Sequence, residues 1–261
     1  MQEDDVFGTC PLCQEENIRL ALSHYMPSAL YSPRNKDLEY FANGQSGIVT
    51  DDLKERLLCH NCEALFDRNG ESYVLNLIRT KAPYFPLQEK LRLALARDSD
   101  PSCDRFSGND LGIDTLKFAY FAWSIVWRGA VGHWKNFDGS DLIPVELGSY
   151  QEPIRQYLLG KAPMPHDTAV VVIVTKDQFS RETWFVPQPL WEFESWSYRF
   201  HARGVFFRVM MGPHLPQYFR DSCCTSPYKC IFFGDGERRT REAFSKYSSN
   251  KSKTDMPLTY P

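Results

Sequence analysis

The sequence predicts an α+β protein made of a small cysteine-rich N-terminal module and a larger helix-plus-antiparallel-sheet domain. Three observations carry this prediction. Two Cys-x-x-Cys pairs lie near the N-terminus, one long apolar helix follows them, and closely spaced strand-like segments fill much of the rest of the chain. Hydrophobic residues make up 43% of the 261 residues and charged residues 24%. These are ordinary globular values, and they exclude a disordered chain, a collagen-like fibre and a coiled coil.

Charge and hydropathy exclude further classes of protein. With 30 basic and 33 acidic residues the net charge is −3, so the chain is not a uniformly basic nucleic-acid coat, although a local basic patch stays open. The N-terminus is acidic where a secretory signal would be basic and then apolar. The longest strongly apolar stretch, residues 118–127, is far shorter than the roughly 20 residues of a membrane helix. We therefore expect a cytoplasmic protein whose cysteines are thiols or metal ligands rather than disulfides.

Four of the eight cysteines form two knuckles, Cys10-Pro-Leu-Cys13 and Cys59-His-Asn-Cys62. A two-residue spacer lets both thiolates reach one ion, and zinc sites are often built this way. One pair alone could be redox-active, but two pairs predict a structural four-thiolate zinc site, which would supply much of the local folding energy. The remaining cysteines show no ligand spacing, and we interpret them as core or surface thiols: Cys103, Cys223, Cys224 and Cys230.

Between the knuckles, a predicted strand over residues 18–22 leads into Ser23-His24-Tyr25-Met26-Pro27. The second knuckle is followed by Glu63 and, one helical turn later, Asp67. Residues at i and i+4 share one face of a helix. The two carboxylates are therefore either N-terminal residues that stabilise the helix dipole or ligands of a hard divalent cation.

This order of knuckle, strand, His-x-x-Pro, loop, knuckle and helix resembles the HNH endonucleases, in particular the branch in which two zinc knuckles brace a ββα-metal (treble-clef) unit. The resemblance covers about residues 7–80. It implies that the knuckle cysteines bind a structural Zn²⁺, that His24 is the general base and that Pro27 turns the chain after the histidine strand. Neutral imidazole suits proton abstraction from water near pH 7. Ser23 stands where the family often has a carboxylate or histidine, and Glu63 where it usually has asparagine.

The resemblance also implies a reaction and a partner. The expected activity is metal-dependent hydrolysis of DNA phosphodiesters, with His24 and Glu63 as catalytic residues and a Mg²⁺ or Mn²⁺ ion held by Glu63 and Asp67. HNH-like modules joined to other domains are familiar in bacterial anti-phage and mobile-element systems. The C-terminal domain would then choose the target, bind a protein partner or restrain the nuclease. The departures at Ser23 and Glu63 favour an alternative, a non-catalytic zinc module that binds protein or nucleic acid.

The rest of the chain is expected to divide at residues 80 and 110. After a module over residues 1–80, residues 81–110 would form a short helix (87–97) and a linker (98–110), residues 111–245 the second domain and residues 246–261 a flexible tail. Within the module, the helix after the second knuckle is expected to end at an Asn69-Gly70 turn, with a second helix or strand over residues 73–78.

Residues 113–134 form the strongest predicted helix, because apolar and aromatic residues recur at intervals of three and four on most of its sides. We interpret this aromatic stripe as core packing. Arg128 interrupts it, and an unpaired buried charge is costly, so we expect an acceptor for Arg128 inside the second domain.

A second helix is expected over residues 146–159, followed by about five strands joined by antiparallel hairpins: 168–175, 183–186, 191–200, 205–211 and 228–233. A one-residue slip at Glu194-Ser195 predicts a β-bulge. Residues 237–253 carry a local net charge of +4, which indicates either phosphate contact or a solvated helix and tail. The sequence contains no phosphate-loop or dinucleotide motif and no Gly-x-Ser-x-Gly nucleophile elbow.

Overall fold

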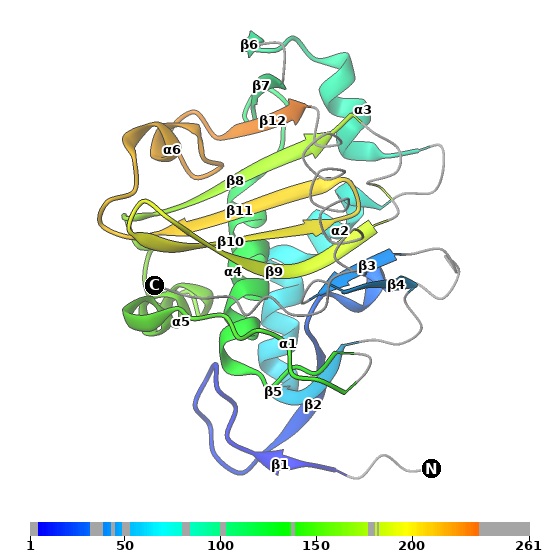
Figure 1. Ribbon diagram of the computed structural model, residues 1–261, viewed down its shortest axis with the longest axis vertical. Helices are drawn as coiled ribbons and strands as arrows, with labels where there is room; N and C mark the ends of the chain where they lie inside the picture. Colours follow the sequence, from blue (N-terminus) through cyan, green and yellow to red (C-terminus); the bar gives the residue numbers. More distant parts are fainter. Residues whose placement is uncertain are drawn as a thin grey trace, which may run out of the picture.

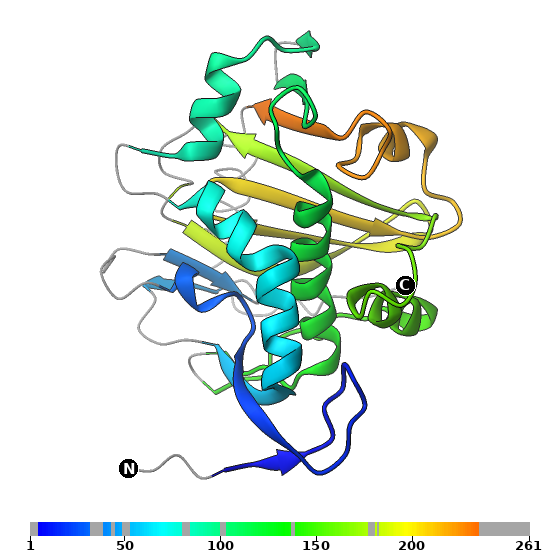
Figure 2. The ribbon, with the colours of Figure 1, turned by 180° about the vertical axis from the view of Figure 1, so that it is seen from behind.

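The computed structural model describes residues 5–31, 39–42, 45–48, 53–79, 84–99, 103–136, 139–176, 181 and 183–234. The basic segment 237–253 and the expected tail 246–261 lie outside these residues. None of the described helices is both long enough and apolar enough to cross a membrane. The chain is α+β, as its sequence predicts, with the helices over residues 60–78 and 115–131 packed against one face of a large twisted sheet and the short helix over residues 217–222 against the other (Figures 1 and 2).

The described strands form two sheets. The smaller one has the order β1-β2-β5 (Phe7–Gly8, Ile18–His24, Lys54–Cys59) and is antiparallel throughout. The larger one has nine strands in the order β4-β3-β9-β10-β11-β8-β12-β7-β6. Their bounds are β3 Glu39–Ala42, β4 Gln45–Ile48, β6 Asp98–Ser99, β7 Cys103–Ser107, β8 Thr168–Thr175, β9 Thr183–Glu192, β10 Ser195–Ala202, β11 Val205–Met211 and β12 Cys230–Gly234.

Most neighbouring strands of the large sheet run antiparallel, but β12 runs parallel to β8 and β3 runs parallel to β9. The sheet is therefore mixed. The predicted linker over residues 98–110 is wrong in part, because β6 and β7 lie there and β7 pairs with β12. These strands close one edge of the sheet. Edge strands are commonly short and polar, so their sequence looks like that of a loop.

Residues 193 and 194 form a tight turn, so the predicted β-bulge at Glu194-Ser195 is also wrong. Both Phe193 and Glu194 have positive φ (52° and 57°), and Glu192 pairs with Ser195 across the hairpin. Two successive residues with positive φ match the twist of a two-residue β-hairpin. The register shift in this hairpin lies further along, between Arg199 and His201.

The helix that starts at the second knuckle does not turn at Asn69-Gly70. Segments α1 (His60–Phe66), η2 (Asp67–Glu71) and α2 (Ser72–Ile78) follow one another directly, and η2 is a π-helical turn. Gly70 lies where this helix crosses α4 (Thr115–Val131), and a Cβ atom there would be 2.9 Å from the backbone nitrogen of Phe121. The Asn-Gly pair thus marks a close helix crossing rather than a chain reversal.

Helix α4 confirms the predicted central helix. The carboxylate of Asp114 caps its N-terminus by accepting a hydrogen bond from the Leu116 nitrogen at 3.1 Å, and Trp123 and Trp127 are fully buried. Shorter helices complete the described fold: η1 Ser28–Leu30, α3 Pro86–Leu93, η3 Gly148–Tyr150, α5 Gln151–Leu158 and α6 Gln217–Ser222.

The larger of two hydrophobic clusters joins the two expected parts of the chain; the smaller one, around Val171 and Met210, lies on the other face of the sheet. The larger cluster contains Leu58 and Phe66 from the module, Trp127 from α4 and Val172 from β8. Strand β3, which lies between the two knuckles in sequence, belongs to the large sheet. The expected boundary at residue 80 therefore separates segments that share one core.

Candidate functional site

The four knuckle cysteines converge. Cys10 and Cys13 lie in the loop after β1, Cys59 is the last residue of β5, and Cys62 lies in the first turn of α1. Their sulfur atoms all lie within 4.8 Å of one another, and those of Cys13 and Cys59 are 3.8 Å apart. Thiolates about 2.3 Å from a tetrahedral ion would be about 3.8 Å from each other. The cluster therefore has the spacing of a metal site.

The thiols of the cluster are close enough to change one another's acidity. A hydrogen bond with the Cys62 thiol, supported by backbone amides including that of Cys59, lowers the pKa of Cys10 to about 4. The same contact with Cys10, together with burial, raises the pKa of Cys62. One thiolate thus forms at the expense of its neighbours, and a bound cation would let all four ionise. Within the described residues, no other group of three or more His, Cys, Asp or Glu side chains gathers in this way.

His24, the predicted base, is the last residue of β2 and pairs with Lys54 of β5. Its side chain is half-buried, and its ring centroid lies 6.0 Å from that of Tyr31. Pro27 directly precedes the short helix η1, so the chain turns after the histidine strand as expected. The Tyr31 hydroxyl accepts a hydrogen bond from the Met26 nitrogen at 3.3 Å, which ties this turn together.

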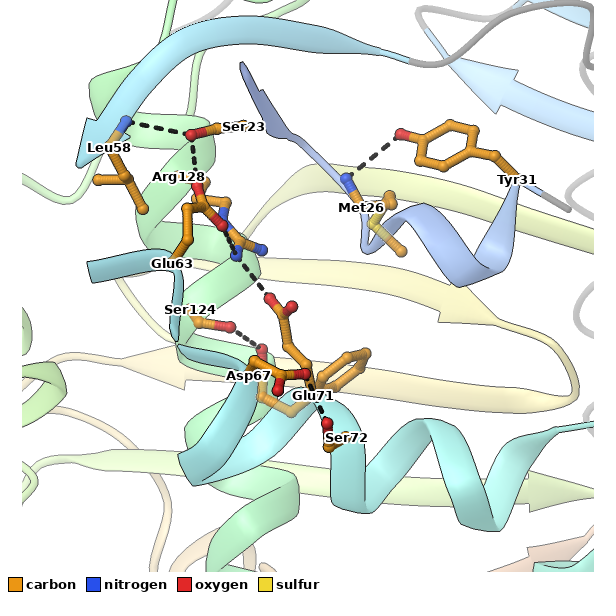
Figure 3. A network of polar contacts seen from close by, with 11 residues as sticks. Ser23, Met26, Tyr31, Leu58, Glu63, Asp67, Glu71, Ser72, Ser124 and Arg128 are labelled. Atoms are coloured by element: carbon orange, nitrogen blue, oxygen red, sulfur yellow. Dashed lines mark hydrogen bonds and ion pairs between the residues drawn. The ribbon is translucent and has the colours of Figure 1, made fainter. Parts of the chain in front are cut away.

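The two positions that depart from the HNH pattern contact each other. The Ser23 hydroxyl donates a hydrogen bond to a carboxylate oxygen of Glu63, and it accepts one from the Leu58 nitrogen at 3.0 Å (Figure 3). Ser23 is 1% exposed. The hydroxyl therefore links β2, β5 and the start of α1, and it fixes one side of the Glu63 carboxylate.

Arg128 of α4 contacts the other oxygen of the Glu63 carboxylate. Its Nη2 lies 3.5 Å from Glu63 Oε2 and 2.6 Å from Glu71 Oε1, and its guanidinium lies 4.8 Å from the centroid of the Phe66 ring. The expectation that Arg128 finds its acceptor inside the second domain is wrong, because both carboxylates come from the helix that follows the second knuckle (Figure 3). Helix α4 packs along that helix, so the partners come from the neighbouring segment.

The π turn explains how one guanidinium reaches both carboxylates. Glu63 and Glu71 are eight residues apart. In a regular α-helix a residue at i+8 lies about 80° around the helix from residue i, whereas a residue at i+7 lies almost above it. A π turn absorbs one extra residue, so i+8 takes the place of i+7. The bulge at η2 therefore directs Glu63 and Glu71 toward the same side.

The ion pairs of Arg128 are buried, and only some of the polar atoms involved have hydrogen-bond partners. Arg128 is 1% exposed, and Glu71 is also buried. Burial raises the pKa of Glu71 against the opposing attraction of Arg128. Within the described residues, Nε and Nη1 of Arg128 have no hydrogen-bond partner. The arginine thus acts mainly as a buried counter-charge for two carboxylates.

Asp67, the second expected metal ligand, is exposed and accepts a hydrogen bond from Ser72 Oγ at 2.5 Å. In the described residues, Glu63 and Asp67 belong to no group of three or more His, Cys, Asp or Glu side chains within ligand distance of one another. Sequence reasoning missed Glu71 and the pairing of Ser23 with Glu63. The only available signal was Arg128, an arginine in the most apolar helix of the chain.

Comparison with known proteins adds no relative. No protein-family model, no curated protein and no solved structure matches the chain.

Proposed function

We propose that residues 7–80 form a zinc-braced treble-clef unit of the HNH type. The supporting geometry is a four-cysteine cluster that joins a loop before β2 to the start of α1, with β2 and β5 antiparallel beside it. Four thiolates in a tetrahedral arrangement suit Zn²⁺, which has no geometric preference from its d electrons. The zinc would be structural, because all four ligand positions come from the protein.

On this frame the chain acts as an endonuclease that hydrolyses DNA phosphodiesters. The carrying observation is the place of His24, which ends the strand that faces the knuckle helix and is half-buried rather than enclosed. Its imidazole takes a proton from a water molecule while the water oxygen attacks phosphorus and the bond to the leaving oxygen breaks. A Mg²⁺ or Mn²⁺ ion bound by Glu63 and Asp67 would stabilise the charge on the leaving oxygen. Mg²⁺ commonly needs only one or two carboxylates, because substrate phosphates and water supply its remaining ligands.

In this proposal the sheet and its helices position the nuclease unit and select its target or a protein partner. Because one core joins both parts, α4 with its Arg128 lies between the nuclease unit and the sheet. An anti-phage or mobile-element setting follows from the resemblance alone.

The proposal is tested by plasmid nicking with Mg²⁺ and with Mn²⁺. Nicking by the zinc-loaded protein, abolished by a chelator that leaves the cysteine-bound zinc in place, is the expected result. No nicking with either ion, for protein with intact zinc, contradicts it.

A second candidate is a non-catalytic zinc module that binds protein or nucleic acid. It is favoured by Arg128, which already neutralises Glu63 and Glu71 at short distance and would oppose a divalent cation there. In such a module the Arg128 guanidinium, rather than a catalytic ion, balances the charge of Glu63 and Glu71. Retained binding to DNA in the absence of cleavage under any divalent ion would support this candidate.

A further inference from the structure

Arg203 is another buried arginine, and among the described residues it has no carboxylate partner of the kind that Arg128 has. It is 6% exposed and lies in the turn between β10 and β11. Its Nη2 donates a hydrogen bond to the backbone oxygen of Leu30 at 3.2 Å, while its Nε has no partner among the described residues. No carboxylate of the described residues forms an ion pair with it, and its charged neighbour is another arginine, Arg79.

The electrostatics of this site are therefore unfavourable for a cation. Burial, and then the like charge of Arg79, lower the pKa of Arg203. Arg79 lies at the C-terminal end of α2 and is exposed. A buried charge is normally paired, because desolvation alone costs far more than one neutral hydrogen bond returns. Among the described residues this guanidinium therefore has no counter-charge, and it is available to an anion.

The backbone gives an independent indication. Arg203 and Gly204 both have positive φ, 43° and 82°. A two-residue hairpin of this kind favours asparagine or aspartate before glycine, and arginine is strained in the left-handed region. Strain of this kind gathers at functional sites, where the surrounding structure enforces it.

The surrounding structure does enforce it. The Arg203 nitrogen donates to the Thr183 oxygen at 3.0 Å, the Gly204 nitrogen donates to His201 Nε2 at 3.0 Å, and the Thr175 nitrogen donates to the Gly204 oxygen at 2.9 Å. The turn is thus held by two neighbouring strands and its own hairpin. A side chain on so rigid a turn is preorganised for a ligand.

The position connects this arginine to the candidate nuclease unit. Leu30, its hydrogen-bond acceptor, lies in η1, directly after the turn that follows His24 and Pro27. The Tyr31 ring packs against Trp184 at 4.9 Å, and Trp184 pairs with Ala202, the residue before Arg203. Arg203 therefore contacts η1, the short helix that follows His24 and Pro27 in the chain.

We propose that Arg203, together with Arg79, binds a phosphate group. Guanidinium matches the geometry of phosphate oxygens with paired N–H donors, and it remains charged at all physiological pH values. The phosphate belongs to a nucleic-acid backbone or to a small phosphorylated molecule. The inference concerns binding only, so it stands or falls separately from cleavage.

The first experiment measures thermal unfolding in a constant excess of potassium chloride with and without millimolar phosphate, which is too dilute for the general stabilisation that concentrated phosphate gives to folded proteins. Phosphate should raise the midpoint of the wild-type protein above its value in chloride, because a ligand bound only to the folded state stabilises it. Arg203→Met should unfold in chloride at the wild-type temperature or above it, since an unpaired charge has been removed, and it should lose the phosphate response.

Arg155→Met is the matched control. Arg155 is also buried, at 8% exposed, but it binds Glu152 and donates to the Leu12 oxygen at 2.6 Å. Its replacement should lower the midpoint in chloride and leave the phosphate response intact. A phosphate response that survives in Arg203→Met, or a wild-type midpoint that millimolar phosphate does not change, overturns the proposal. If Arg203→Met does not fold, Arg79→Gln at the exposed partner decides, with a reduced phosphate response expected and an unchanged response contradicting the site.

The second experiment identifies the source of the phosphate group, using anisotropy of a fluorescent DNA duplex at several salt concentrations. Loss of one phosphate contact in Arg203→Met should weaken binding and reduce the salt slope by about one. This result assigns the site to nucleic acid. A phosphate response without duplex binding assigns it to a small phosphorylated molecule. Duplex binding and cleavage with no role for Arg203 and no phosphate response leave the nuclease proposal standing and overturn this one.

Discussion

Arg128 of α4 binds the carboxylate of Glu71 at 2.6 Å, and this ion pair joins the central helix to the helix that begins at the second cysteine knuckle. Both residues are buried, so neither charge is screened by water. The pair exists because a π turn brings Glu71 to the side of the helix that also carries Glu63. It fixes the position of the helix whose first turn supplies Cys62 to the cysteine cluster.

Removing Arg128 should therefore destabilise the whole protein. Arg128→Met leaves Glu71 buried without its cation, at an expected cost of ~3–5 kcal/mol in the free energy of unfolding. Arg128→Met combined with Glu71→Leu should recover most of the lost stability, because the double variant has no unpaired buried carboxylate at position 71. Urea denaturation of both variants measures the difference. Arg97→Met is the control, since its pair with Asp110 is largely exposed and should contribute less than about 1 kcal/mol. Equal stability of the Arg128 single and double variants would show that Glu71 is not the partner that matters.

Gly70→Ala tests the close crossing of the two helices. Helix propensity alone favours alanine by about 1 kcal/mol. The added Cβ would lie 2.9 Å from the Phe121 nitrogen and 3.2 Å from the Lys117 oxygen, and α4 is too well packed to move away. We expect a net loss of ~1–3 kcal/mol. Asn76→Ala, at an exposed position of α2, is the matched control and should be neutral or slightly stabilising. A stabilised Gly70→Ala protein would mean that the helices lie further apart than described.

Metal removal should affect more than the N-terminal module. Because the core is shared, Cys59→Ser should abolish metal binding and lower the unfolding midpoint measured by tryptophan fluorescence. This signal reports on the second part of the chain, because all six tryptophans, Trp123 and Trp127 among them, lie after residue 80. Metal analysis of the purified protein should find about one zinc per chain, as a four-thiolate site requires. Cys103→Ser, outside the cluster, should retain the metal and the midpoint. Loss of the module with an unchanged tryptophan transition would instead show two independent domains, as the sequence alone suggested.

Some elements of this fold leave a pattern in the sequence and others do not. Helix α4 and strand β8 were predictable, because burial on most sides leaves an apolar pattern with a clear period. The cysteine cluster was predictable because its ligands come as spaced pairs. Strand β7, next to the edge strand β6, was not predictable, since a polar segment near an edge obtains its order from pairing with β12.

The ion network was hidden for a different reason. The register of Glu63 and Glu71 depends on a π turn, and nothing in the spacing of the two glutamates reveals it. Asn69-Gly70 has the composition of a turn, and only the approach of α4 explains glycine there. Arg128 could be recognised as needing an acceptor, but its partner lies across a tertiary contact between segments distant in sequence.

The most direct test of the central proposal is the nicking rate of His24→Ala beside that of the wild-type protein, with zinc content measured on the same samples. His24 does not belong to the cysteine cluster, so the variant should stay folded and zinc-loaded. Loss of a general base should slow cleavage ~10²–10⁴-fold. His166→Ala, at an exposed position outside the module, should cleave at the wild-type rate. Cleavage by His24→Ala at the wild-type rate would contradict the assignment of His24 as the base, and a wild-type protein that never cleaves would leave the binding module as the function.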